Sequence, residues 1–459
     1  MRKFILLIFM IFGIGATSVG QVSVVASGTS AIGDSYRQTI IRERSPSEVI
    51  TCEVGETVTS FSCETLSLTY RQTVAISAIV VRDFRVWNDM VVFCGQEVVS
   101  KKGIVGYFPC SEFDVTSPPP FQYTYFHVGA AAGHYLRDIQ RLAVYTAPDG
   151  EPHIVAFGYD SINLGWGYLQ QYLIDCKDFM TGFSSGNLQY EMMPLNRTAT
   201  PGIEQPSDLC YTGKYVVVVG YLGGVMQHGL TLRRCDPDLP LHGDGEALFY
   251  SIETDTLVGY PEIRISAIGE ETVAVAYRGR LVSPAGVDYS RLRVFDVGVM
   301  ANAGSQQWMP GGKVYMHELI YMAVDNSIVL LDDALVGDVY SSAFRYLDPY
   351  ATVSYPSTYL YDPDHCYSSL TRLGSQHFVG SGSLHWLYRD KMAPLPAYNS
   401  YPTTPTYCPA NGQQKVEMVK KVVVYKYTPP LYLYNHIEMQ RPGGGTIMQM
   451  TIIPNCISN

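Results

Sequence analysis

A stretch of the sequence from Pro261 to Val297 contains three short runs with strand character, separated by two loops. The runs cover residues 263–268, 273–277 and 292–297, and each is rich in aliphatic or aromatic side chains. Short runs of this kind, bounded by Gly, Pro and Asp, are typical of β-strands. Because the same pattern returns along the chain, it constrains the fold more than any other feature.

Each copy of this unit opens with a polar residue, usually acidic, followed by a large apolar one. The openings are Asp83-Phe84, Asp138-Ile139, Asp208-Leu209, Glu262-Ile263, Glu318-Leu319 and Ser369-Leu370. A compact apolar run, an alternating run and one further strand-like run accompany this opening strand, which makes four strands per unit. A repeat longer than about 40 residues with four strands per period is typical of propeller blades. The compact second run predicts a strand that is buried on both faces.

We therefore predict an all-β protein, a β-propeller of six to seven four-stranded blades. A β-sandwich or a string of small β domains would use the same strand types. Six repeats span residues 68–390, and a Pro/Tyr-rich connection covers 391–414. Residues 21–67 and 415–459 hold further strand-like runs. Closure removes exposed sheet edges, so we expect these N- and C-terminal strands to form one closing blade.

The strand pattern of residues 68–390 resembles that of β-propeller proteins as a class. It does not include a family motif, because the Trp-Asp dipeptide and the Asp-box of two propeller families are absent. Gly223-Gly224 and Gly311-Gly312 are similar to the double glycine of kelch repeats, but the Tyr and Trp that should follow are missing in the other units. The resemblance therefore implies a fold and no active site.

The N-terminal 20 residues have the pattern of a secretory signal peptide. Met1-Arg2-Lys3 is basic, residues 4–12 are wholly apolar, and small residues follow up to Ser18-Val19-Gly20. This order predicts cleavage before Gln21 and a secreted, periplasmic or cell-surface protein. The apolar run is shorter than the roughly 20 residues that span a bilayer, so no transmembrane segment is expected.

Charge and motifs exclude several kinds of partner and chemistry. The formal net charge is −10 at pH 7, which repels phosphate backbones, so nucleic acid is not expected as a partner. The sequence lacks a nucleophile elbow, a zinc-binding helix and a phosphate-binding loop. It predicts no cofactor, no metal site and no catalytic residue.

The chain contains ten cysteines, an even number that suits an oxidising compartment. Proximity along the chain suggests two candidate disulfides, Cys52 with Cys63 and Cys366 with Cys408. A second group recurs at the end of the last strand of successive units, which suggests a shared structural role: Cys110, Cys176 and Cys235.

The acidic residues that open the units allow two interpretations. Asp83, Asp138, Asp208, Glu262 and Glu318 would form a ring around a central channel, where they would bind a cation or supply a carboxylate pair for glycoside chemistry. Alternatively, they accept hydrogen bonds from backbone N–H groups at strand starts. Catalytic residues normally break repeat symmetry, so the structural interpretation is favoured.

Tyrosine is enriched between residues 340 and 407, partly in loop-like sequence. Exposed tyrosines suit protein and glycan surfaces, which makes Tyr355, Tyr398 and Tyr401 candidate binding residues. Packing of the loops against the propeller is the alternative. The sequence thus favours a secreted, monomeric, non-enzymatic propeller that binds a protein or carbohydrate. An extracellular polysaccharide hydrolase or lyase, or a structural component of a surface assembly, are the other hypotheses.

Overall fold

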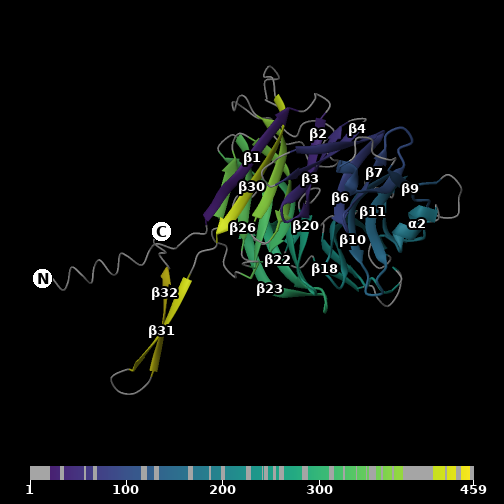
Figure 1. Ribbon diagram of the computed structural model, residues 1–459. Coiled ribbons are helices and arrows are strands. Elements are labelled where there is room, and N and C mark those ends of the chain that lie inside the picture. Colours follow the sequence, from purple (N-terminus) through teal and green to yellow (C-terminus); the bar gives the residue numbers. More distant parts are fainter. Residues whose placement is uncertain are drawn as a thin grey trace. The chain divides into compact units, whose positions relative to one another are not determined.

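The structure is a computed structural model that contains β-strands, short turns and little helix (Figure 1). It describes residues 21–31, 36–55, 58–65, 70–114, 121–128, 134–163, 169–185, 188–197, 202–223, 229–239, 241, 247–251, 255–257, 263–281, 288–309, 315–323, 326–336, 339–347, 349–350, 358–362, 365–374, 377–385, 417–428, 432–440 and 446–454. The expected signal peptide, residues 1–20, and the connection 391–414 lie outside these ranges. None of the helices among the described residues has the length and apolar character needed to span a membrane.

The strands are arranged in successive antiparallel sheets. The first sheet consists of β2 (Tyr36–Ser45), β3 (Glu48–Gly55), β4 (Val58–Thr65) and β5 (Tyr70–Ser77). The second consists of β6 (Ile79–Trp87), β7 (Met90–Glu97), β8 (Gly103–Pro109) and β9 (Gln122–Tyr125), with a short 3-10 helix, η2 (Cys110–Asp114), after β8. The third consists of β10 (Asp138–Thr146), β11 (Pro152–Asn163), β12 (Leu169–Cys176) and β13 (Tyr190–Pro194), with helix α2 (Phe179–Ser185) between its last two strands.

Three further sheets continue the series. The fourth contains β14 (Asn196–Arg197), β15 (Gly202–Tyr211), β16 (Val216–Gly223), β17 (Leu230–Cys235) and β18 (Ala247–Ser251). The fifth contains β19 (Asp255–Leu257), β20 (Ile263–Gly269), β21 (Thr272–Leu281), β22 (Asp288–Asp296) and β23 (Ala301–Met309). The sixth contains β24 (Tyr315–Met322), β25 (Ser327–Val336), β26 (Val339–Leu347) and β27 (Thr358–Asp362).

The seventh sheet joins strands from both ends of the chain. Its order is β1 (Gln21–Ala31), β30 (Glu417–Thr428), β29 (His377–His385) and β28 (His365–Leu373), and Figure 1 shows β1 beside β30. The N-terminal region differs from the expectation for residues 21–67, because only β1 belongs to this sheet. Strands β2 to β5 are linked by short connections and pair with each other in a sheet of their own.

The C-terminal region also divides. Only β30 enters the seventh sheet, whereas β31 (Tyr432–Gln440) and β32 (Thr446–Pro454) form a separate two-stranded hairpin. This hairpin belongs to a second compact unit made of residues 1–23 and 426–459. Its strands pair in register from Tyr432 opposite Pro454 to Gln440 opposite Thr446.

Neighbouring sheets of the main unit contact each other through one inner strand each. β2 contacts β6, β6 contacts β10, β10 contacts β15, β15 contacts β20, β20 contacts β24, and β24 contacts β28, which in turn contacts β2. Sheets that stack in this way, each joined to the next along one inner strand, form a β-propeller. The prediction of an all-β propeller is therefore confirmed.

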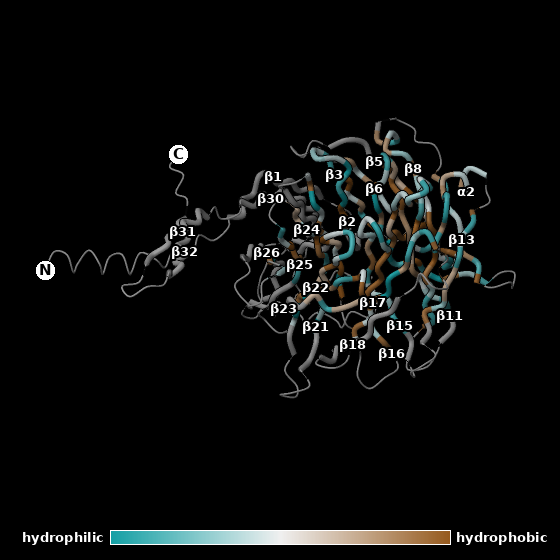
Figure 2. The backbone as a smooth tube through the Cα atoms, turned by 90° about the horizontal axis from the view of Figure 1, so that it is seen from below, coloured by the Kyte–Doolittle hydropathy of each residue, from teal (hydrophilic) through white to brown (hydrophobic). Residues whose placement is uncertain are grey.

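The hydrophobic core consists of layers between adjacent sheets. The strand next to the inner strand of a sheet contributes to layers on both sides; in β16, for example, Val217 and Val219 belong to one cluster and Val216 and Val218 to another. Residues 91–93, 154–157, 216–219, 273–276 and 328–331 are all buried, and Figure 2 shows hydrophobic stretches concentrated within the sheets. This confirms that the compact apolar runs are strands with two buried faces.

The predicted disulfide between Cys52 and Cys63 is not formed. Cys52 lies opposite Phe61, and Cys63 lies opposite Ile50, so the two cysteines are offset by two residues across β3 and β4. Diagonal neighbours in a sheet are about 7–8 Å apart, which exceeds the usual Cα separation of a disulfide. The side chains of the other predicted pair, Cys366 and Cys408, lie outside the described residues.

The three cysteines at repeat-equivalent positions are all buried: Cys176 and Cys235 end β12 and β17, and Cys110 directly follows β8, so each lies one strand before the last strand of its sheet and not at the end of the last one as expected. Burial raises the pKa of the Cys110 and Cys235 thiols to about 12. It also raises the pKa of Cys176 well above its usual value. Neutral thiols of this kind pack as small apolar side chains, which fits the predicted structural role.

Candidate functional site

Five inner strands have a β-bulge, and the residue after the bulge carries a polar side chain. In β6 the bulge falls between Val81 and Asp83, and in β15 it falls between Pro206 and Asp208. The same irregularity precedes the corresponding residues of three other inner strands: Arg141 in β10, Glu318 in β24 and Ser369 in β28. A bulge adds one residue to one strand and re-aims the side chains that follow it.

Two members of the predicted acidic ring are therefore replaced by arginine. In β10 the position equivalent to Asp83 is Arg141, whereas Asp138 lies at the strand start, where its carboxylate is 2.9 Å from Nε of Arg82. In β20, Ile265 N–H donates to Asp208 in the way that Leu142 N–H donates to Asp83, so Arg264 takes the equivalent position. Glu262 lies outside the described residues.

The positions thus alternate between acid and base around the inner strands. We call the set of Arg42, Asp83, Arg85, Arg141, Asp208, Arg264, Glu318 and Ser369 the central network. Arg42 contacts three different sheets: its guanidinium lies 2.7 Å from Asp83, 3.1 Å from Glu318 and 3.3 Å from the Ser369 hydroxyl. One side chain reaches three sheets only because their inner strands converge.

Each carboxylate of the central network also connects two blades. Asp83 accepts hydrogen bonds from Phe84 N–H of its own strand at 2.9 Å and from Leu142 N–H of the next blade at 3.4 Å. Asp208 accepts one from Ile265 N–H at 3.2 Å. Glu318 accepts one from Leu370 N–H at 3.5 Å. These contacts favour the interpretation that the acidic residues satisfy backbone N–H groups.

The charges of the central network do not suit a cation. Its described side chains include four arginines and three carboxylates, so the excess charge is positive. Arg141 lies 3.7 Å from Asp208, and Arg85 lies 3.0 Å from Asp83. Guanidinium groups interposed between carboxylates prevent the convergence of oxygen ligands that a hard cation requires.

Burial and nearby charges shift the pKa values of these acids in opposite directions. Burial alone would raise the pKa of Asp83, but Arg85 and Arg42 hold it below the usual range. The pKa of Asp208 is raised, because its burial outweighs the attraction of Arg141 and Arg264. Burial raises the pKa of Asp138 to about 6, despite the adjacent Arg82.

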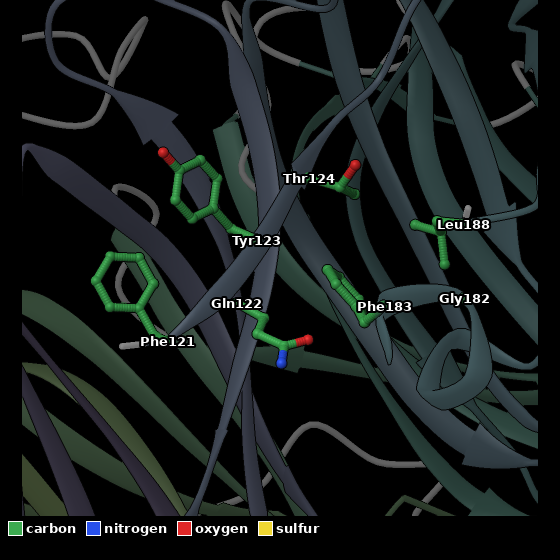
Figure 3. A pocket seen from close by; sticks show the side chains of 7 residues that line it. All are labelled: Phe121, Gln122, Tyr123, Thr124, Gly182, Phe183 and Leu188. Atoms are coloured by element: carbon green, nitrogen blue, oxygen red, sulfur yellow. The ribbon is translucent and has the colours of Figure 1, made fainter. Parts of the chain in front are cut away.

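A pocket of about 370 Å³ lies between β9 of the second sheet and α2 of the third. It is lined by Phe121, Gln122, Tyr123, Thr124, Gly182, Phe183 and Leu188. Figure 3 shows Gln122 and Thr124 on the side of β9 that faces Phe183 and Leu188, with the rings of Phe121 and Tyr123 on the other side. This alternation follows from the two-residue period of a strand.

The wall formed by α2 is fixed by aromatic packing. Phe179 and Phe183, four residues apart on one face of the helix, contact Trp87 and Tyr107 of the second sheet at ring distances of 5.5 Å and 5.0 Å. A Cβ atom at Gly182 would lie 2.8 Å from the Leu188 side chain, so glycine permits the close approach that shapes the pocket. Helix α2 is thereby packed against the second sheet, to which β9 belongs.

A row of aromatic rings continues along the other face of β9. Phe121 stacks on Tyr123 at 5.6 Å, and Tyr123 meets Tyr125 edge-on at 5.6 Å. Tyr135 extends the row, and the Lys102 ammonium lies 3.8 Å from its ring centroid. Tyr123 is 39% exposed. The pocket and the row together offer an amide, a hydroxyl and accessible aromatic faces within one short strand.

The predicted binding residues are not among those that the structure describes: Tyr355, Tyr398 and Tyr401 all lie outside the described ranges. The residues around β9 were not predicted. Their signal in the sequence is the alternation F-Q-Y-T-Y-F at residues 121–126, in which every second residue is aromatic. The contribution of α2 has no comparable local signal, because the helix is only seven residues long.

The chain resembles β-propeller proteins as a class. The propeller domain of the Trilobed protease from Pyrococcus furiosus matches with 8% identity and a TM-score of 0.45, over 77% of this chain and 93% of that one. The Dos1 propeller matches with 8% identity and a TM-score of 0.42, over 88% and 95%. At such identities the likeness concerns the fold alone.

A prolyl endopeptidase matches with 11% identity and a TM-score of 0.44 over 92% of this chain. The match covers 55% of that protein, so the chain spans about half of its length. No family model matches the chain, and no curated protein matches its sequence.

Proposed function

We propose that this protein is an exported, non-enzymatic β-propeller that binds carbohydrate at the pocket between β9 and α2. The observation that carries the proposal is the combination of the open pocket with the exposed ring of Tyr123 on the same strand. Export is proposed from the signal-like residues 1–20.

The chemistry of the pocket suits a sugar. The Gln122 amide oxygen accepts a hydrogen bond from the Tyr107 hydroxyl at 3.2 Å, which orients its NH2 group as a donor for a sugar hydroxyl; Thr124 offers a hydroxyl that both donates and accepts. Phe183 and Leu188 provide apolar surface for the C–H faces of a pyranose ring. A pocket of this kind, with few polar groups in a preformed wall, is typical of small-ligand sites.

The exposed aromatic row extends the surface beyond a single sugar unit. Tyr123 and Phe121 form a stacked pair, which presents a flat face at little cost in side-chain entropy. Phe121 and Tyr123 of this row also line the pocket, so a sugar chain that leaves the pocket along β9 would contact the row as well. The geometry therefore favours an oligosaccharide or polysaccharide over a monosaccharide.

A glycan array followed by calorimetry with the best ligand tests this proposal. We expect Tyr123→Ala and Gln122→Ala each to weaken binding about tenfold or more, since a central aromatic or hydrogen-bonding contact contributes about 1–2 kcal/mol. Tyr350→Ala is the matched control, because Tyr350 is similarly exposed, at 46%, on the sixth blade. The Tyr350→Ala variant should bind the glycan with the same affinity as the unmodified protein.

Two results would overturn the proposal. One is the absence of glycan binding by the unmodified protein combined with capture of a peptide or protein ligand. The other is a bound glycan whose affinity is the same in both β9 variants. Circular dichroism and melting temperature of the variants show whether a loss of binding has a structural cause.

A second candidate is a polysaccharide hydrolase or lyase, in which a carboxyl group of the central network such as Asp208, whose pKa is raised by burial, would act as the general acid. An Asp208→Asn variant distinguishes the two. Loss of polysaccharide cleavage with an unchanged melting temperature would support the enzyme, whereas loss of stability alone would support the structural role.

A further inference from the structure

The turn between β10 and β11 carries a group of potential metal ligands that lies outside the site described above. Asp149, Glu151 and His153 each offer one ligand atom, and these atoms lie within 4.8 Å of one another. The two carboxylates are exposed, whereas His153 is buried at 2% exposure. Among the residues that the structure describes, no basic side chain forms an ion pair with either carboxylate.

The local backbone holds the three residues in this arrangement. The Asp149 side chain accepts a hydrogen bond from Glu151 N–H at 2.9 Å, and Gly150, at φ 90°, completes the turn. Ala147 N–H donates to Glu151 C=O at 2.8 Å. Glu151 directly precedes β11, His153 lies within it, and the turn at Gly150 brings Asp149 close to both, so the three ligand atoms lie within 4.8 Å of one another.

The imidazole of His153 is oriented for coordination through Nε2. Its Nδ1 lies 3.2 Å from the Asp175 carboxylate and 3.4 Å from the Tyr145 hydroxyl. Its Nε2 is buried and has no hydrogen-bond partner. In the tautomer that carries its proton on Nδ1, Nε2 is the free base, and a carboxylate near Nδ1 is the usual environment of a metal-binding histidine. An unpartnered ring nitrogen beside two carboxylates needs a partner, and a cation supplies one.

We propose that Asp149, Glu151 and His153 bind a divalent transition-metal ion, of which Zn²⁺ is the best fit. Imidazole nitrogen favours Zn²⁺ and related ions, whereas Ca²⁺ and Mg²⁺ prefer sites made only of oxygen ligands. Zn²⁺ lies about 2.0–2.2 Å from such ligands, so tetrahedral ligand atoms are about 3.4 Å apart. The exposed carboxylates can move inward by side-chain rotation to reach that spacing.

The donor set leaves the coordination of the ion incomplete. Three protein ligands occupy three positions of a tetrahedral ion, and the fourth is available to water or to a donor atom of a bound molecule. The carboxylates lie at the surface, so this fourth position is accessible. The site is independent of the proposed carbohydrate pocket, and its test does not depend on that proposal.

Zn²⁺ titration of the full-length protein by calorimetry tests the site, with Ca²⁺ as the competing ion. We expect saturable binding of one Zn²⁺ ion that the Asp149→Asn/Glu151→Gln variant weakens at least tenfold, with no comparable response to Ca²⁺. Asparagine keeps the oxygen that accepts the Glu151 N–H bond, so the turn is preserved. The Glu270→Gln/Glu271→Gln variant removes the same charge from another exposed turn and should bind as the unmodified protein does.

Co²⁺ provides a second readout, because its visible absorption bands report coordination by nitrogen and oxygen ligands. The bands should appear in the unmodified protein and disappear in the Asp149→Asn/Glu151→Gln variant. Asp175→Asn, which changes the positioning residue at Nδ1, should weaken Zn²⁺ binding about 10–100-fold. Equal Zn²⁺ affinity in the ligand variant and the unmodified protein, or no saturable binding at all, would overturn the proposal.

Discussion

Removal of the Asp83 carboxylate should strongly destabilise the propeller. Asp83 is fully buried, and its oxygens contact Arg42 at 2.7 Å, Arg85 at 3.0 Å, and the amides of Phe84 and Leu142. Removing one partner of a buried ion pair costs about 3–5 kcal/mol, because the remaining charge stays buried without compensation. We expect an Asp83→Ala variant to lose about this much of the free energy of unfolding.

This loss corresponds to a measurable shift in melting temperature. An unfolding entropy of about 2.1 cal/mol/K per residue amounts to about 1 kcal/mol/K for a chain of 459 residues. The expected decrease is therefore about 3–5 °C, measured by calorimetry and by urea unfolding. Asp83→Asn, which keeps an oxygen for Phe84 N–H, should lose less and remains measurable if the alanine variant does not fold.

The control is an exposed ion pair. Glu271 pairs with Lys214, and both side chains are about half exposed, at 47% and 48%. Solvent screens such pairs, so Glu271→Gln should leave the melting temperature unchanged within experimental error. A decrease for Asp83→Ala no larger than that of this control would refute the argument that the central network joins the blades.

A double-mutant cycle separates the pair from its surroundings. If Arg42 and Asp83 interact directly, the Arg42→Met/Asp83→Leu variant should be more stable than the sum of the two single changes predicts, because no uncompensated charge of the pair remains. Strict additivity would show that the two side chains act independently.

The remaining predictions concern one acid and two thiols. The pKa of Asp138 is about 6 in the folded state and about 3.9 in an unfolded chain. Between pH 4 and 6 the folded state therefore binds more protons than the unfolded chain, so the free energy of unfolding should decrease as the pH rises, by at most about 3 kcal/mol. Urea unfolding should show this decrease in the unmodified protein and a smaller one in the Asp138→Asn variant. Cys52 and Cys63 form no disulfide, so both thiols should react when the protein is alkylated in denaturant without a reductant, and the intact mass should show both modifications. If these two cysteines stay unmodified and the mass shows the loss of two hydrogens that a disulfide causes, the structure is contradicted.

The strand order within blades was predictable because it depends on local composition. The runs at residues 216–219 and 273–276 are continuously apolar, and both are buried on two faces. Pairing between distant segments was only partly predictable. The sequence predicts that strands from the two ends of the chain share a sheet. The strand order in the structure shows which ones do: β1 pairs with β30, whereas β2 to β5 form a separate sheet.

The central network shows why a sequence repeat does not predict which charged side chain occupies an equivalent position in each blade. Asp138 and Asp83 both open a unit in the sequence, yet the bulge after Ile139 assigns Arg141 to the position of Asp83. A bulge depends on the register with the partner strand, which the residues of one strand do not specify. An alignment of polar–apolar pairs therefore predicted an acidic ring where acids and bases alternate.

Both proposed sites depart from the repeat, as is expected when function requires residues that a blade does not need for folding. The pocket exists because α2 is inserted between the third and fourth strands of the third blade, and its wall packs on the second. The potential metal ligands lie in the turn of the same blade, where Asp149-Gly150 by itself indicates only a turn. The burial of His153 beside Asp175 is what distinguishes that turn from an ordinary acidic one, and this information comes from the packing of β11 against β12.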